Sequence, residues 1–383
     1  MAGTRADAIK LAPVVARLSA DSDLRTTFLV TGQHRELLYQ ALATFGLTPD
    51  FDLEIMERDL DVGVVLVRAL EGVRRAIRDV EPQLVVVQGD TTTSFAAALA
   101  AFYERAPVAH VEAGLRTNDL AQPFPEEANR ALISVIARLH LAPTPTARAN
   151  LVAEGVPVEQ ILVTGNTAID ALREVASREL ELGTRLLEGI LQQADSRRLV
   201  VITSHRRESW GEVERGIARA IARVATASPA YSFVLPLHPN PRVRTAMRPF
   251  LRDLPNVHVT GPLAYPEMIG LLSRAYAVAT DSGGIQEEAC ALGVPTLVLR
   301  DVTERPEGVD RGVTRVIGTR EDRVEHELGR LLGDESLRRR MAKASGVFGD
   351  GRASERIHGA VRTFVGFPTG VEEFVPPADE GAG

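Results

Sequence analysis

The sequence predicts an α/β protein of two domains, each a parallel sheet covered by helices on both faces. Short β-branched runs alternate with longer amphipathic patterns along most of the chain, as expected of parallel sheets. The alternation restarts near Leu199, after a polar stretch at residues 173–198 that lacks strand character. In addition, the 383 residues exceed the roughly 250–300 at which a single hydrophobic core stops growing.

The expected elements follow this alternation in order. The first domain covers residues 1–170 and begins with an amphipathic helix, and the second covers residues 171–353. Residues 366–383 are rich in proline, glycine and acid, so we expect a disordered tail. The runs predicted to form strands are residues 27–31, 84–87, 108–111, 161–164, 199–203, 233–237, 257–260, 277–280 and 295–299.

Composition narrows the class of function. The net charge of −7 argues against a nucleic-acid surface, and the sequence has neither a readable signal peptide nor an apolar run long enough for a membrane span. A single cysteine, Cys290, excludes an internal disulfide and fits a reducing cytoplasm. The eight histidines show no metal-ligand spacing, so we predict no metal site. These totals predict a cytoplasmic protein with a small phosphorylated ligand.

Ligands of open parallel sheets bind beyond the carboxyl ends of the strands, and the first unusual residues fit such a place. Gly3-Thr4-Arg5 precedes the first helix, so Arg5, Lys10 and the helix N-terminus could meet an anion. A solvated helix start explains the same residues equally well.

Acids follow two of the predicted strands of the first domain. Asp90 comes after residues 84–87, where the residues alone favour a helix cap. Glu112 follows residues 108–111 at a strand end facing the ligand crevice, which is harder to explain structurally. Glu126 and Glu127 come later, at a proline-held helix start, where the helix dipole also favours acids.

The second domain carries the expected phosphate contacts. His205 and Arg206 follow an apolar strand, where they could receive charge on a leaving phosphate, and His238 repeats that placement more weakly. The strongest single motif is DSGGIQEE, in which Ser282, Gly283 and Gly284 leave amides free for a diphosphate. Glu288 lies one turn on and could bind the hydroxyls of a ribose, while Arg305 could complete a phosphate clamp. A glycine-loosened turn is the structural alternative.

These motifs together resemble the non-hydrolysing UDP-N-acetylglucosamine 2-epimerases, from Gly3 to about Ile357. The matching segments, in order, are GTRADAIKLAPV, QHRELL, GDTTTSFAAALAAFY, HVEAGLRT, PFPEEANR, TGNTAIDAL, SHRRES, DSGGIQEEA and RDVTERPEG. The resemblance implies the glycosyltransferase-B fold of two Rossmann-like domains, a UDP-sugar in the cleft between them, a homodimer and no cofactor. It also implies that a helix at residues 354–365 returns to the first domain.

The resemblance also assigns residues to the chemistry. Catalytic positions of the family fall on Asp90, Glu112, Glu126 and His205, and nucleotide contacts fall on Arg5, Lys10, Ser282, Gly283, Glu288 and Arg305. The implied reaction eliminates UDP to a 2-acetamidoglucal and adds it back after a proton reaches the opposite face of C2. Which acid serves which face stays open. A second, activating substrate molecule is implied at Gln33, Arg68, Glu127, Arg206 and His238, although Glu36 stands where regulated members place glutamine.

One further expectation concerns the start of the chain, and several alternative functions stay open. Members of the family have a central strand before Gly-Thr-Arg, whereas only Met1 and Ala2 precede it here, so we expect the true start to lie upstream. The same chemistry on a UDP-2,3-diacetamido hexuronate is an alternative function. A glycosyltransferase of this fold and a nucleotide-sugar sensor without turnover are further alternatives.

Overall fold

The computed structural model describes residues 1–32, 35–55, 60–178, 185–194, 197–204, 211–237, 240–343 and 345–378. The chain forms two compact α/β units, which confirms the predicted fold class. Unit 1 contains Met1–Arg173 and Phe348–Pro376. Unit 2 contains Glu174–Val347 and the described residues from Pro377 onward.

Unit 1 contains two parallel sheets, β1-β2 and β3-β4-β5-β6. Their strands are β1 (Leu29–Val30), β2 (Phe51–Asp52), β3 (Val85–Gln88), β4 (Val108–Val111), β5 (Leu139–Ala142) and β6 (Ile161–Val163). β2 and β5 were not predicted, because β2 has two residues and β5, LHLA, carries a histidine and follows a helix after a two-residue connection.

Met1 and Ala2 lie between these two sheets. The α-ammonium of Met1 donates to the Val86 carbonyl of β3 at 2.9 Å, and the Ala2 amide donates to Leu29 O of β1 at 3.0 Å. The Thr31 amide donates back to Ala2 O at 3.1 Å. The two residues therefore occupy the central strand position, and the chain passes from there directly into the Gly3 turn.

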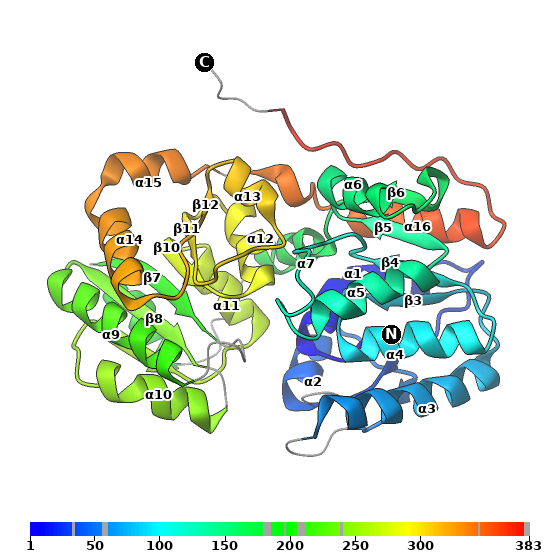
Figure 1. The fold of residues 1–383 in the computed structure, drawn as a ribbon, viewed down its shortest axis with the longest axis horizontal. Helices are drawn as coiled ribbons and strands as arrows, with labels where there is room; N and C mark the ends of the chain where they lie inside the picture. The colour runs from blue at the N-terminus through cyan, green and yellow to red at the C-terminus, as the bar shows by residue number, and fades with distance from the viewer. Residues whose placement is uncertain are drawn as a thin grey trace. The chain divides into compact units, whose positions relative to one another are not determined.

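The helices of unit 1 cover its sheets in two groups (Figure 1). α3, α4 and α5 pack against one another, while α1 contacts α2 and α16. The helices are α1 (Arg5–Ser19), α2 (Arg35–Thr44), α3 (Val62–Val80), α4 (Thr92–Tyr103), α5 (Glu126–Ile136), α6 (Pro145–Ala153), α7 (Thr167–Ala176) and α16 (Ala353–Phe364), with a 3₁₀ turn at Val158–Gln160.

Helix α1 begins in a capping box. The Thr4 hydroxyl accepts from the Asp7 amide at 3.2 Å, and the Asp7 carboxylate accepts from the amides of Gly3 and Thr4 at 3.0 and 3.1 Å. A side chain at position 3 would place its Cβ 2.2 Å from the Thr93 hydroxyl oxygen, so the approach to α4 requires glycine. The opening turn is thus a closely packed structure rather than a solvated helix start.

The last helix belongs to unit 1, as the resemblance implied. Asp170 of α7 accepts hydrogen bonds from the first two amides of α16, at 3.1 Å from Ala353 and 2.8 Å from Ser354. Farther along α16, Arg362 forms an ion pair of 2.5 Å with Asp21, and this partner lowers the pKa of Asp21 to about 2. These contacts join the two ends of the chain in one unit.

Part of the expected disordered tail packs onto unit 1. Phe374 is 3% exposed, and its amide donates to Val163 O of β6 at 2.8 Å. The Val163 amide donates in turn to the Glu373 carboxylate at 3.2 Å. The prediction of disorder from composition is wrong for this segment, because an average over many residues does not show that a single aromatic side chain can be buried. Residues 379–383 lie outside the described part.

Unit 2 contains one six-stranded parallel sheet in the order β12-β11-β10-β7-β8-β9. Its strands are β7 (Arg198–Thr203), β8 (Tyr231–Pro236), β9 (Val257–Thr260), β10 (Ala275–Thr280), β11 (Thr296–Val298) and β12 (Thr314–Val316), the last of which was not predicted. Its helices are α8 (Arg185–Ala194), α9 (Glu212–Ala227), α10 (Pro241–Leu251), α11 (Tyr265–Leu272), α12 (Gly283–Ala291), α13 (Pro306–Asp310), α14 (Glu321–Gly333) and α15 (Glu335–Met341), with a 3₁₀ turn at Gly346–Phe348. The strand order reverses between β7 and β10, and in open parallel sheets ligands bind at the carboxyl ends of the strands beside such a reversal.

A buried acid lies at this end of unit 2. Glu214, in the first turn of α9, is fully buried on the same face as Ile217 and Ile221. Its two carboxylate oxygens lack a hydrogen-bond partner of normal geometry among the described residues. Burial, with a further contribution from the charge of Asp281, raises the pKa of Glu214 to about 7.

None of the helices in the described part of the chain combines the length and hydropathy of a membrane span.

We expect Asp170→Ala to destabilise unit 1, because two amides at the start of α16 would lose their buried acceptor. The free energy of unfolding should fall by about 1–3 kcal/mol. Chemical denaturation measures this change. Glu355→Ala, which removes an exposed i,i+3 ion pair with Arg352 in the same helix, is the control and should cost less than about 0.5 kcal/mol. Equal losses in the two variants would contradict the capping role.

Glu214 should make the stability of the protein depend on pH. Its raised pKa means that the folded state binds the Glu214 proton more tightly than the unfolded state does. The contribution of this proton to stability is fully present below pH 4.5 and is lost as pH rises through about 7. Glu214→Gln should therefore be more stable than wild type at pH 8, by about 1–3 kcal/mol, and should show little difference at pH 4. Glu212→Gln, at an exposed position of the same helix, should keep the wild-type slope.

Candidate active site

The carboxyl ends of β3 and β4 bring two of the predicted acids to one edge of unit 1. The two strands pair in parallel, with Gln88 opposite Val111, and Asp90 and Glu112 follow them. The structure excludes a capping role for Asp90, because Thr91 is the N-cap of α4 and accepts from the Ser94 amide at 3.2 Å. The cap that the residues alone favour for Asp90 is therefore supplied by its neighbour Thr91.

Glu112 is held in a buried polar network. Lys10 of α1 forms an ion pair with one carboxylate oxygen, and the Gln88 side-chain amide donates to the other at 2.6 Å. The side chains of Lys10 and Glu112 are 10% and 9% exposed. Glu112 has a φ of 65°, a left-handed conformation that costs a non-glycine residue roughly 1–3 kcal/mol. Such strain at a strand end next to a buried cation is typical of a functional position.

Asp90 is held by the helix that begins with Glu126. Arg130 of α5, whose side chain is 3% exposed, forms an ion pair of 2.7 Å with Asp90. The Asn129 side-chain amide donates to the Asp90 carbonyl at 2.9 Å. Sequence reasoning missed Arg130 and Asn129, although Arg130 lies four residues after Glu126 and so on the same face of the helix.

Glu127 organises the loop after β4. One oxygen accepts from the amides of Thr117 and Asn118 at 2.9 Å each, and the carboxylate forms an ion pair of 3.4 Å with Arg130. Glu127 is 2% exposed. These contacts give it a structural role in the loop, and its expected contact with an activating substrate molecule stays a prediction.

His110 supports the turn that carries Asp90. Its Nε2 lies 2.7 Å from the Gly89 carbonyl, and burial lowers the pKa of the histidine to about 3, so the ring is neutral and donates this hydrogen bond. The histidine has no exposed surface. It therefore contributes to the position of the turn between Gln88 and Asp90.

The remaining predicted residues of unit 1 take varied positions. Glu126 is the first residue of α5 and is half-buried, and Arg5 is the first residue of α1. Arg68 on α3 donates to the Ile55 carbonyl at 3.1 Å. Four further candidates lie outside the described residues: Gln33, His205, Arg206 and His238.

In unit 2, the DSGG motif forms the start of α12 at the carboxyl end of β10. Ser282 is the N-cap residue, and Gly283 and Gly284 form the first positions of the helix, where amides have no partner within the helix. A Cβ at position 283 would lie 2.4 Å from the Arg305 guanidinium, so a larger residue there would displace the guanidinium from its present position. Free amides, a helix N-terminus and an adjacent guanidinium form a site suited to a phosphate.

Buried acids fix the guanidinium of Arg305. Its Nε donates to Glu287 at 2.6 Å, and Glu304 accepts from Nη1. Arg305 and Glu288 are each 6% exposed. The orientation of the Arg305 guanidinium is thus set by Glu304, its neighbour in the sequence, and by Glu287 of α12.

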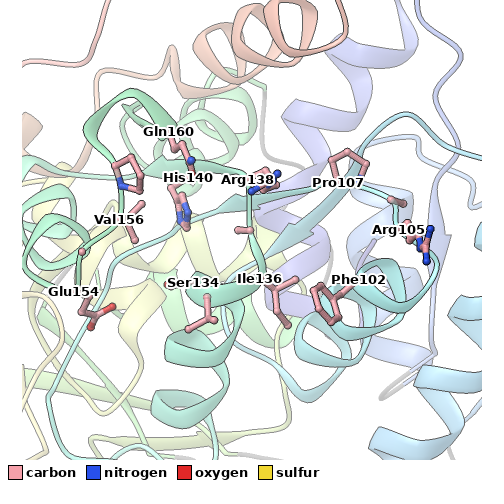
Figure 2. Close-up of a pocket in the computed structure, with 15 residues that line it drawn as sticks. Phe102, Arg105, Pro107, Ser134, Ile136, Arg138, His140, Glu154, Val156 and Gln160 are labelled. Atoms are coloured by element: carbon pink, nitrogen blue, oxygen red, sulfur yellow. The ribbon is translucent and has the colours of Figure 1, made fainter.

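The groove of unit 1 shown in Figure 2 lies away from the acids. Its lining includes Pro107, Arg138 and Gln160, which directly precede β4, β5 and β6. The groove is therefore at the amino ends of these strands, whereas Asp90 and Glu112 follow carboxyl ends.

Among the described residues, there is no group of three His, Cys, Asp or Glu side chains placed to bind a metal ion.

Comparison with known proteins agrees with this arrangement. A sequence profile of UDP-N-acetylglucosamine 2-epimerase matches residues 16–362. The UDP-N-acetylglucosamine 2-epimerase of Salmonella typhimurium is 44% identical over 94% of this chain and 97% of its own length.

Solved structures give the same result. The S. aureus MnaA structure with UDP superposes with a TM-score of 0.92 at 39% identity, covering 97% of each chain. The Neisseria meningitidis UDP-GlcNAc 2-epimerase bound to UDP-GlcNAc gives 0.89 at 40% identity, covering 95% of this chain and 98% of that one. The chain therefore belongs to the UDP-N-acetylglucosamine 2-epimerase family.

Proposed function

We propose that this protein interconverts UDP-N-acetylglucosamine and UDP-N-acetylmannosamine by eliminating UDP and adding it back. The observation that carries the proposal is the set of acids with buried cationic partners at the carboxyl edge of unit 1: Lys10 with Glu112 and Arg130 with Asp90. Family membership identifies the sugar, and the acids supply the proton transfers that inversion at C2 needs.

The chemistry requires general acid–base groups because the C2 proton of the sugar is not acidic. In the forward step a carboxylate removes this proton, a C1–C2 double bond forms, and the C1–O bond breaks to release UDP. In the reverse step UDP adds to C1 while an acid delivers a proton to the other face of C2. Asp90, Glu112 and Glu126 are the candidates for these transfers, and His205 is the candidate acid for the departing diphosphate.

The nucleotide contacts have distinct tasks. The amides at Gly283 and Gly284 and the guanidinium of Arg305 bind the diphosphate and stabilise its charge as it leaves. Glu288 accepts from the hydroxyls of the ribose. Arg5 and Lys10 of unit 1 add positive charge, although Lys10 is already paired with Glu112, so its first task is to keep that carboxylate ionised.

The reaction is tested by incubating the full chain with UDP-N-acetylglucosamine in D2O and following C2 by proton NMR. We expect UDP-N-acetylmannosamine to appear with deuterium at C2 in both sugars, because every elimination exchanges the C2 proton. Product without deuterium would contradict proton abstraction at C2, and free UDP with free sugar as the sole products would show hydrolysis instead.

Glu112→Gln should abolish turnover while leaving the fold intact. Glutamine keeps the size, and its one carbonyl oxygen can still accept from Lys10, while its NH2 group can donate to the Gln88 side-chain oxygen if the Gln88 amide flips. It cannot transfer a proton, so kcat should fall by about 10²–10⁴. Glu159→Gln, an exposed acid of the same unit, is the matched control and should keep full activity. Wild-type kcat in Glu112→Gln would remove Glu112 from the mechanism.

We also propose a homodimer through the adjacent helices α3, α4 and α5. These helices expose large apolar side chains on the face away from the sheet: Val64 and Val67 on α3, Phe102 and Tyr103 on α4, and Leu132 and Val135 on α5, with exposures of 39–85%. Several large exposed apolar side chains on neighbouring helices are typical of a protein–protein interface. Phe102 and Val135 also line the groove of Figure 2, which offers a depression for side chains of the second copy.

The dimer is tested by light scattering after size exclusion. Val135→Asp should convert the dimer to a monomer, because a carboxylate at the 85% exposed position would be buried without a partner. Val375→Asp, at an 80% exposed position outside these helices, should leave the mass unchanged. A monomeric wild type, or a dimeric Val135→Asp, would exclude this interface.

A further inference from the structure

We infer that unit 2 carries a second anion site, which binds a phosphate-type oxyanion at the amino ends of β7 and β10. A pocket of about 340 Å³ opens there, whereas the Ser282 loop follows the opposite, carboxyl end of β10. Four of its eight lining residues are arginines, namely Arg197, Arg198, Arg274 and Arg338, and none of the eight is acidic. This volume is at the lower end of small-ligand pockets, which suits a diphosphate rather than a polymer.

Two of the arginines contact one aromatic ring. The guanidinium carbons of Arg198 and Arg338 lie 4.8 and 4.3 Å from the ring centroid of Tyr276. The Tyr276 hydroxyl accepts from Arg198 at 3.0 Å and donates to Glu335 at 2.7 Å. These cation–π contacts hold both guanidinium groups next to the ring, which limits their motion before a ligand binds.

The negative charge near the pocket does not balance the positive charge. Glu335 is 3.4 Å from Arg198 and 3.7 Å from Arg338, and it also pairs with Arg339, which does not line the pocket. Among the described residues, one carboxylate therefore pairs with two of the four lining arginines, Arg198 and Arg338.

The other two arginines have no acidic partner in the described part of the chain. Arg274 donates to the Gly270 carbonyl at 3.0 Å but forms no ion pair with a described residue, and neither does Arg197. The buried Nε of Arg338 also lacks a hydrogen-bond partner among the described residues. Spare N–H donors on several guanidinium groups thus border one pocket.

The donors define the chemistry of the ligand. A guanidinium group matches oxyanions through two parallel hydrogen bonds, and several such groups favour an anion with more than one charge. Leu199 and Ala275 contribute an apolar wall, which reduces screening by water. Phosphate and diphosphate groups, whether free or on a nucleotide, fit these properties.

Isothermal titration of the full chain with pyrophosphate at fixed ionic strength tests the site. We expect wild type to bind one more equivalent of pyrophosphate per chain than the double variant Arg197→Gln/Arg338→Gln. Any pyrophosphate bound at the Ser282 loop is common to both proteins and does not change this difference. Arg197→Gln alone, which leaves the Tyr276 stack intact, should weaken this binding roughly tenfold or more. Arg252→Gln, at a 67% exposed side chain of the same unit paired with its neighbour Asp253, is the charge-matched control and should bind as wild type does.

The outcomes separate clearly. Equal stoichiometry and affinity in wild type and the double variant, or no binding to wild type up to millimolar pyrophosphate, would overturn the inference. Thermal melting verifies that the variants fold. A parallel titration with ADP, evaluated as the difference between wild type and the double variant, identifies the source of the oxyanion: tighter binding than pyrophosphate indicates a nucleotide, and equal binding indicates the free anion.

Discussion

Buried charge at the carboxyl edge of unit 1 is the constraint on which the rest of this structure depends. A carboxylate removed from water must be paired, because the cost of leaving it unpaired is several kcal/mol. Glu112 is paired with Lys10 and Gln88, and Asp90 with Arg130. These partners come from α1, β3 and α5. Both acids therefore reach their positions only when α1 and α5 have packed beside β3 and β4.

The two units place their functional groups in the same way. In unit 1 the Gly3 turn and the turn after β3 are adjacent, and the Thr91 hydroxyl joins them by donating to Asp7 at 3.1 Å. In unit 2 the Ser282 loop follows β10, next to β7, where the strand order reverses. Parallel sheets place helix N-termini and loop side chains at such points, so one architecture can supply both the proposed proton-transfer groups and the proposed phosphate contacts.

Much of this could be predicted from the sequence, and the failures have identifiable causes. The alternating pattern predicts the fold class and most strands, but not β2, β5 or β12, which are short or interrupted by a polar residue. Asp90 and Glu112 stand out because they directly follow apolar strands. Arg130 does not, because an arginine within an amphipathic helix is normally solvated, and only its three-dimensional contact with Asp90 shows otherwise. Glu214 escaped notice because acids at a helix start are ordinary, and its burial depends on packing that the local sequence does not encode.

The most direct test of the electrostatic account is the pH dependence of kcat/KM for UDP-N-acetylglucosamine in wild type, Arg130→Gln and Arg130→Lys. The cation beside Asp90 favours the ionised carboxylate, so its removal should raise the pKa of Asp90 and move the acidic limb of the profile upward by about 1–3 pH units. Arg130→Lys, which keeps the charge, should restore most of the wild-type profile. An acidic limb that stays in place in Arg130→Gln while the rate falls would contradict the claim that Arg130 keeps Asp90 ionised.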